Sequence, residues 1–412
     1  MDLSTNSLNS LNSFNLLLVA STQPSAVPIN CPPLNRTRTD ASNREIFTSK
    51  HGKTSKRNTL RGVIINCNGL KGSAHSTEFQ ALLELHEPDF VLGTESKLHP
   101  DVPTYSIYPP SYAVFRKDRN ANGGGVFQAI KSHLVCVEEV DFNNDNCEIL
   151  WSSLKIGNDK ALYLSSFYRP PNSPSETLDC LGDSISEVFT KIPHHPNVIA
   201  AGDFNLGDVD WHCEIPTTSN PSTASQHNKL LHLMDDYSLT QHVKVPTRPA
   251  LGKTLDLLLS TYLNSVSGVF TSPGLSDHYI VNFEVNLEAT RSPKPSYRVY
   301  EYKKANFGGL NEFIAKSSSE FFASDPRENT VEHNWDAFKN AVIVGISQYV
   351  PQKSPKPKYK LPWITPTIKR EMRRKDRLHR KALRSKNQQH WNAFKSQRNQ
   401  VAKLIKESHK LP

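Results

Sequence analysis

The chain has 412 residues and a formal net charge of +9, a length that allows two or three folded units, one of them able to bury a full core. Residues 356–412 carry 18 Lys and Arg against three acidic residues, or +15, so the rest of the chain carries −6. The six cysteines are scattered without a Cys-x-x-Cys pair, which argues against a zinc site and a disulfide framework. The apolar run at residues 16–20 is too short for a signal peptide or a membrane span. We therefore expect an intracellular protein whose basic end contacts a polyanion.

Residues 1–58 are rich in Ser, Asn, Thr and Pro and predict a disordered leader, because this composition buries too little apolar surface to order itself. Apolar runs of strand length then recur at residues 62–67, 90–92, 125–130, 149–156, 161–168, 198–201, 255–259 and 279–285. Helical patterns lie between them at residues 76–86, 176–191 and 226–236. Strands interleaved with helices predict one α/β domain over residues 59–288.

The chain beyond this domain alternates linkers and helical patterns. Prolines and cations predict linkers at residues 289–302 and 353–362. Apolar residues spaced by three or four predict a helical segment at residues 303–352, and residues 363–412 predict a basic tail of two helices. A solvated helix surface is the alternative interpretation of the tail, but such surfaces mix both charge signs.

Two amides leave the strand predicted at residues 62–67 on one side. Side chains alternate along a strand, so Asn66 and Asn68 point the same way, opposite to Cys67. Two amides there can orient a metal-bound carboxylate or donate to a phosphate oxygen. Taken alone, they are more typical of a turn at Gly69.

Carboxylates follow two further apolar runs. Glu95 comes after residues 90–92 and Gly93, at a strand's carboxyl end, where one carboxylate with water and substrate oxygens suffices for Mg²⁺; a surface Glu is the alternative. Asp203 and Asn205 flank Phe204, so both polar groups face one side if the strand continues. An Asx turn would explain one of them but not the pair.

A third carboxylate, Asp256, lies among leucines and needs a partner because burying it unpaired is costly. His278 is the natural candidate, since an Asp on one ring nitrogen would fix the tautomer and turn the other nitrogen toward a phosphate.

In this order the motifs resemble the endonuclease/exonuclease/phosphatase family, specifically the apurinic/apyrimidinic-like endonuclease of non-LTR retrotransposons. The resemblance covers about residues 59–287 and extends loosely over residues 297–412, where Pro-Trp-Ile-Thr-Pro at 362–366 is similar to the region before the reverse transcriptase. It implies a four-layer αββα sandwich of the DNase I type. It also implies Mg²⁺ or Mn²⁺, DNA as partner, element RNA on the basic tail, and action in the nucleus without a membrane or a small-molecule cofactor.

The resemblance also implies residue roles. Asp203 would orient or deprotonate the attacking water, and Asn205 would hold phosphate or metal geometry. Tyr168 would donate its phenol to phosphate, although a half-buried core aromatic is the alternative. Thr247 would line the site.

The remaining roles concern the metal and the DNA backbone. The metal set implied is Glu95 and Asn66, with Asp277 adding a metal or water contact. Asn68 and Ser276 would bind phosphate or hold the loop, and Arg116 would grip the DNA backbone or lie solvated.

Departures from the family pattern leave several functions open. Repair members carry Asp where Asn68 stands, some relatives carry His or Tyr where Leu257 stands, and no Tyr-x-Asp-Asp reverse-transcriptase signature is present. We expect a target-nicking endonuclease that is truncated before the reverse transcriptase, a fragment, or a domesticated derivative. The alternatives are a phosphatase, phosphodiesterase or abasic-site repair enzyme of the same fold, and a catalytically idle nucleic-acid-binding protein.

Overall fold

The computed structural model describes residues 59–120, 122–157, 160–292, 298–353 and 361–409. The predicted leader, residues 293–297 of the first predicted linker and residues 354–360 of the second lie outside these ranges. No helix within them is long and apolar enough to cross a membrane. Cys67, Cys136, Cys147 and Cys180 are free, whereas Cys213 is disulfide-bonded, which the scattered spacing did not predict.

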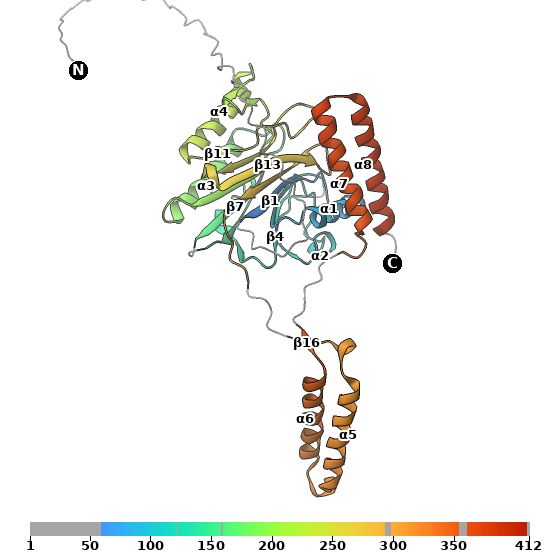
Figure 1. The fold of residues 1–412 in the computed structure, drawn as a ribbon. Coiled ribbons are helices and arrows are strands. Elements are labelled where there is room, and N and C mark those ends of the chain that lie inside the picture. Colours follow the sequence, from blue (N-terminus) through green and yellow to red (C-terminus); the bar gives the residue numbers. More distant parts are fainter. Residues whose placement is uncertain (1–58, 121, 158–159, 293–297, 354–360, 410–412) are drawn as a thin grey trace, which may run out of the picture. The chain divides into compact units, whose positions relative to one another are not determined.

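One six-stranded mixed sheet, here sheet A, begins with the first described strand (Figure 1). In spatial order its strands are β13 (Val266–Pro273), β14 (Tyr279–Val285), β1 (Leu60–Asn66), β2 (Phe90–Thr94), β4 (Val126–Lys131) and β3 (Tyr112–Lys117). β1 and β2 are parallel, with Asn66 beside Thr94, and β1 and β14 are antiparallel. The end of β1 therefore meets the end of β2 and the start of β14.

A second six-stranded sheet, sheet D, contains the other motif strands. In spatial order these are β11 (Thr240–Gln241), β12 (Asp256–Ser260), β8 (Asn197–Asp203), β7 (Ala161–Tyr168), β6 (Glu148–Lys155) and β5 (Cys136–Glu138). β7 and β8 are parallel with Tyr168 beside Asp203, and antiparallel β12 sets Asp256 beside Asp203. One end of sheet D thus gathers three predicted site residues.

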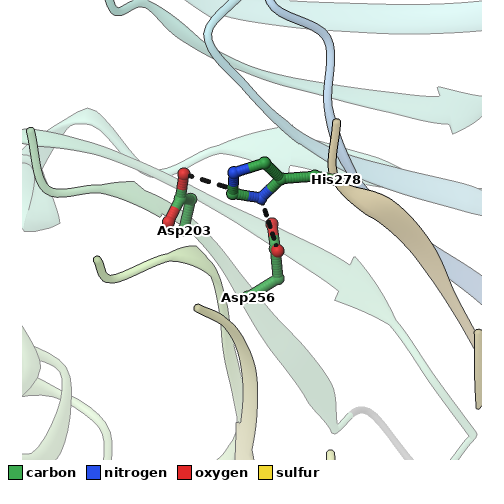
Figure 2. Close-up of side chains that lie close together, drawn as sticks. All are labelled: Asp203, Asp256 and His278. Carbon is green, nitrogen blue, oxygen red and sulfur yellow. Dashed lines mark hydrogen bonds and ion pairs between the residues drawn. The ribbon is translucent and has the colours of Figure 1, made fainter. Parts of the chain in front are cut away.

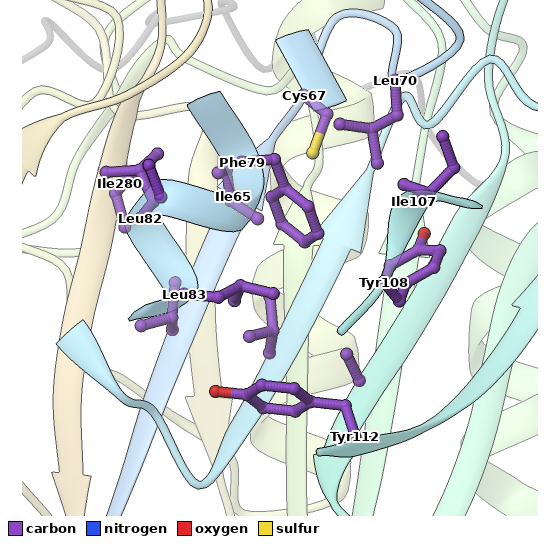
Figure 3. Close-up of a cluster of buried hydrophobic side chains, with 14 of the residues drawn as sticks. Ile65, Cys67, Leu70, Phe79, Leu82, Leu83, Ile107, Tyr108, Tyr112 and Ile280 are labelled. Carbon is purple, nitrogen blue, oxygen red and sulfur yellow. The ribbon is translucent and has the colours of Figure 1, made fainter. Parts of the chain in front are cut away.

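Three apolar clusters hold four layers together. Ile64 and Leu92 of sheet A pack with Leu164 and Ile199 of sheet D in the cluster between the sheets. Helices α1 (Ser73–His86) and α2 (Thr104–Ile107) cover the outer face of sheet A, where Phe79, Leu82 and Leu83 join residues such as Ile65 (Figure 3). Helices α3 (Glu176–Lys191) and α4 (Pro221–Asp236) cover sheet D in the third cluster. The predicted αββα sandwich is confirmed.

Most predicted elements are present with nearly the predicted limits. β7, β14 and α3 match residues 161–168, 279–285 and 176–191 at both ends. Sequence analysis missed β3 and β13, whose half-buried side chains lack a continuous apolar run. It also missed the short pair β9 (Val209–Asp210) and β10 (Ile215–Pro216).

Four longer helices follow the sandwich. α5 (Phe307–Ala323) and α6 (Val331–Tyr349) form a hairpin, and β15 (Val299–Tyr300) pairs with β16 (Gln352–Lys353) beside it. α7 (Pro366–Ser385) and α8 (Gln388–His409) form a second hairpin. Ile368 and Met372 of α7 and Val401 and Ile405 of α8 belong to the outer cluster of sheet A, so the segment predicted as a basic tail of two helices packs against the sandwich.

Candidate active site

Asn66 connects the two sheets at the end of β1. Its Nδ2 donates to Glu95 Oε1 and to Asp203 Oδ2, both over 2.9 Å, and its Oδ1 accepts from the Asn68 backbone over 3.0 Å. The Asn66 side chain is almost fully buried. One amide therefore fixes two carboxylates from different sheets at one point.

Asp203, Asp256 and His278 form a buried cluster whose ligand atoms all lie within 4.8 Å of one another. His278 Nδ1 lies 2.8 Å from Asp256 Oδ2 and 4.0 Å from Asp203 Oδ2, so the ring sits between the carboxylates (Figure 2). Thr247 Oγ1 accepts from the backbone of Leu255 and Asp256, both over 3.0 Å, which fixes the start of β12.

The charges of this cluster favour the protonated, cationic form of His278. Burial lowers the pKa of His278, but the neighbouring carboxylates, chiefly Asp256 and then Asp203, together more than offset this and raise it to about 9. Burial and the facing Asp256 carboxylate raise the pKa of Asp203 well above its usual range. The pKa of Tyr168 is also raised, by burial and by the Glu95 and Asp203 charges. The histidine is thus cationic and the phenol neutral near pH 7.

The remaining polar groups brace the cluster. Asn205 Nδ2 donates to the Arg169 carbonyl over 2.8 Å, and its backbone N–H donates to Asp203 Oδ1 over 3.1 Å. Ser276 Oγ donates to the Asn66 carbonyl over 3.0 Å and accepts from the His278 backbone over 3.2 Å. Each bond ties a loop to a strand end.

Backbone strain concentrates here. Asn68, Glu95, Lys97 and Asn205 have φ values of 44°, 50°, 48° and 49°, a region that non-glycine residues rarely adopt. Such strain persists only where surrounding structure enforces it, and it clusters at functional sites. Gly202, one residue before Asp203, has φ 145°, and a Cβ there would lie 2.0 Å from the Phe167 carbonyl oxygen.

Two predicted site residues are not brought into the cluster. Asp277 forms an ion pair with Arg248 at 2.7 Å, and its side chain is half exposed. Arg116 donates to Asp118, to Thr104 Oγ1 and to two backbone carbonyls. Its guanidinium is thus engaged within the fold, and a contact of Arg116 with the DNA backbone stays a prediction.

Sequence analysis assigned no role to Lys97 or to Arg169. Lys97 Nζ lies 3.3 Å from Glu95 Oε2 and donates to Asn68 Oδ1. The guanidinium of the buried Arg169 donates to Gln226 Oε1 over 2.7 Å. The only signals were the i+2 spacing from Glu95 and the i+1 position after Tyr168, and neither distinguishes a site residue from a surface cation.

The residues present fit a divalent cation. Glu95 offers a carboxylate that is 18% exposed, next to the Asn66 amide. Asp256 Oδ1 is buried without a hydrogen-bond partner, and two carboxylates face each other across the cluster. Hard oxygen donors of this kind are what Mg²⁺ or Mn²⁺ prefers.

Comparison with family models gives two matches. Residues 162–282, which span β7 to β14, match the model described as endonuclease-reverse transcriptase. Residues 364–410 match the model described as the female sterile protein K10 C-terminal domain. A comparison with curated proteins found no match.

Solved structures similar to this chain include two endonucleases and one catalytic domain. The endonuclease domain of TRAS1, a telomere-specific non-LTR retrotransposon, is 18% identical over 55% of this chain and 98% of its own, with a TM-score of 0.44. AP endonuclease LMAP from Leishmania major is 16% identical over 57% and 88%, with a TM-score of 0.44. The Xenopus laevis APE2 catalytic domain is 13% identical over 57% and 94%, with a TM-score of 0.43.

Proposed function

We propose that this chain, whose residues 162–282 match the endonuclease-reverse transcriptase model, is a divalent-metal-dependent DNA endonuclease that nicks one strand of a duplex. The observation that carries this proposal is the Asn66 amide, which holds Glu95 and Asp203 together beside the His278–Asp256 pair. These are the groups that phosphodiester hydrolysis needs: a metal carboxylate, a base and a cationic donor.

The metal would be held by Glu95 with the Asn66 amide. When bound, Mg²⁺ or Mn²⁺ supplies charge stabilisation at a phosphate oxygen and lowers the pKa of a coordinated water. The oxygen-only donors of Glu95 and Asn66 favour these cations over zinc.

Asp203 is the proposed general base. Its raised pKa makes the carboxylate a stronger proton acceptor than an ordinary Asp. The Asn205 backbone N–H fixes Asp203 Oδ1 over 3.1 Å, so the side chain is oriented before water arrives.

His278 and Tyr168 are the proposed phosphate donors. Asp256 occupies His278 Nδ1, which leaves Nε2–H to donate to a non-bridging phosphate oxygen as negative charge develops. Because its pKa is raised, the Tyr168 phenol keeps its proton and donates in the same way.

The finer proposal is that the nick serves retrotransposition. The endonuclease-reverse transcriptase description of the matching model supports it. Cleavage on the 5′ side of the phosphate would leave a 3′ hydroxyl able to prime synthesis on an element RNA, and the enzyme would act in the nucleus.

A supercoiled plasmid tests this function. With Mg²⁺ the protein should yield open circles whose nicks DNA polymerase can extend, and EDTA should stop the reaction. Asp203→Ala and His278→Ala should abolish nicking, whereas Asp236→Ala, an exposed position on α4, should not. Undiminished nicking by both site variants would remove the proposal.

The alternatives of the same fold are distinguished by substrate. Inositol phosphates, phospholipid headgroups and abasic-site duplexes are offered beside the intact plasmid. Faster turnover of any of these would reassign the substrate. Binding of DNA without turnover of any substrate would favour the idle binding protein.

A further inference from the structure

α7 and α8 extend the core of the nuclease domain. Ile368 and Met372 of α7 and Val401 and Ile405 of α8 are buried in the same cluster as Phe79 of α1. Lys369 Nζ pairs with Glu84 Oε1 of α1 at 2.9 Å. The hairpin therefore has a fixed position on sheet A.

The course of α7 leads toward the candidate active site. Glu84 lies near the end of α1. The next strand, β2, begins beside Gly62, at the end of sheet A opposite the candidate site. Further along α7, the His379 ring lies 4.7 Å from the ring of Tyr279, and Tyr279 follows His278 directly. The C-terminal part of α7 therefore reaches the edge of sheet A that carries His278.

The outer side of α7 is a stripe of cations, here called the basic stripe. It consists of exposed residues on one side of the helix: Arg370, Arg373, Arg374, Arg377, Lys381 and Arg384. At 100° per residue these six span an arc of about 100°, opposite the side that buries Ile368, Met372 and Ala382. From Arg370 to Arg384 the stripe runs about 21 Å.

Most of this charge is uncompensated. Glu371 pairs with Arg370 and Arg374. Within the part of the chain that the structure describes, no ion pair involves Arg373, Arg377, Lys381 or Arg384. Packing explains the buried side of α7, but it does not explain four exposed cations that follow one another at intervals of three or four residues.

We infer that the basic stripe binds the phosphates of the target duplex on one side of the bond to be cut, and thereby holds that bond at His278. The inference rests on the proposed function. Duplex DNA carries one negative charge per about 1.7 Å of axis, so a stripe of this length faces several phosphates at once. Its fixed attachment beside Tyr279 favours duplex substrate over element RNA, because the cations keep one position relative to the cluster.

The test neutralises the four unpaired cations without disturbing the packed side. The stripe variant carries four substitutions to glutamine, whose helix propensity is close to that of Arg and Lys: Arg373→Gln, Arg377→Gln, Lys381→Gln and Arg384→Gln. The matched control, Lys303→Gln/Lys304→Gln/Lys316→Gln/Lys339→Gln, removes the same charge from exposed positions elsewhere. Binding of a labelled 30-base-pair duplex is followed by fluorescence anisotropy in EDTA, so hydrolysis plays no part.

The stripe variant should bind at least about tenfold more weakly in 0.1 M salt, and the slope of log affinity against log salt should flatten by about 2 to 4. The control should keep the wild-type slope. An unchanged slope in the stripe variant overturns the inference, as does a loss confined to a single-stranded RNA of equal length. Melting curves matching wild type establish that the variant is folded.

Plasmid nicking separates this inference from the proposed function. In Mg²⁺ the stripe variant should show a raised KM for nicking, with kcat reduced less than twofold, because the reacting groups are untouched. A flattened salt slope in a protein that nicks nothing would keep the inference as DNA binding and remove only the nuclease proposal. A fall in kcat with KM unchanged would contradict the positioning of substrate by the stripe.

Discussion

Asn66 Nδ2 donates to Asp203 Oδ2 over 2.9 Å and so joins the carboxyl ends of β1 and β8, which belong to different sheets. The two residues are 137 positions apart in sequence. The candidate site exists because two sheets pack face to face with these ends in register.

Asp203→Asn should lower kcat/KM for nicking by about 10³-fold or more, because the amide cannot accept the water proton. The same change should raise the melting temperature, because it removes a buried charge that faces Asp256. Nicking assays and thermal unfolding in EDTA measure the two effects. Asp236→Asn serves as the control, and a variant that loses stability along with activity would contradict the assigned electrostatics.

Glu95→Gln should raise the Mg²⁺ concentration for half-maximal nicking on the order of 10- to 100-fold, because a neutral amide is a weaker ligand. Metal binding should weaken in parallel when calorimetry is used without DNA. Glu320→Gln, on the exposed side of α5, leaves both values unchanged. An unaltered Mg²⁺ dependence in Glu95→Gln would exclude Glu95 as the ligand.

The pH dependence of stability in EDTA should reveal the His278–Asp256 pair. Folding raises the pKa of His278 from 6.5 to about 9, so its contribution is complete below pH 6.5 and is lost as pH rises through 9. The raised pKa of Asp203 acts in the same direction, since its charged form grows costlier with rising pH. The loss attributable to His278 is on the order of 3 kcal/mol.

Urea unfolding at several pH values between 6 and 9.5 measures this loss. His278→Gln should flatten the decline, while His333→Gln on exposed α6 retains it. A wild-type protein that gains stability across this range would contradict the pairing.

His379→Phe should stabilise the protein, because both ring nitrogens of His379 are buried without hydrogen-bond partners, next to Tyr279, Trp391 and Phe394. Burial lowers the pKa of His379 from 6.5 to about 4, so stability is present above pH 6.5 and declines as pH falls toward 4.

The substitution should raise the free energy of unfolding by about 1–3 kcal/mol near pH 7, because two unsatisfied polar atoms are removed. It should also abolish the loss of stability that His379 causes at acid pH. Thermal melts at pH 7 and pH 4.5 test both points, with His333→Phe as the control. A destabilised Phe variant would indicate a partner for His379 that the packing does not predict.

The sequence by itself determined the strands, helices and polar motifs of this protein. β7, β14 and α3 follow from continuous apolar runs and helical periodicity, and Glu95, Asp203 and Asp256 were identifiable because each follows or begins an apolar strand. These are local patterns, and local steric and hydrophobic preferences fix them.

Only the tertiary structure decided which of these groups share a site. In it the Asn66 amide donates to both Glu95 and Asp203. Asp277 forms an ion pair with Arg248, and Arg116 donates to a loop carbonyl. The two helices of the basic tail also pack as a hairpin against sheet A, with His379 beside Tyr279. Contacts between residues far apart in sequence depend on how sheets and helices pack, and no local pattern encodes that packing.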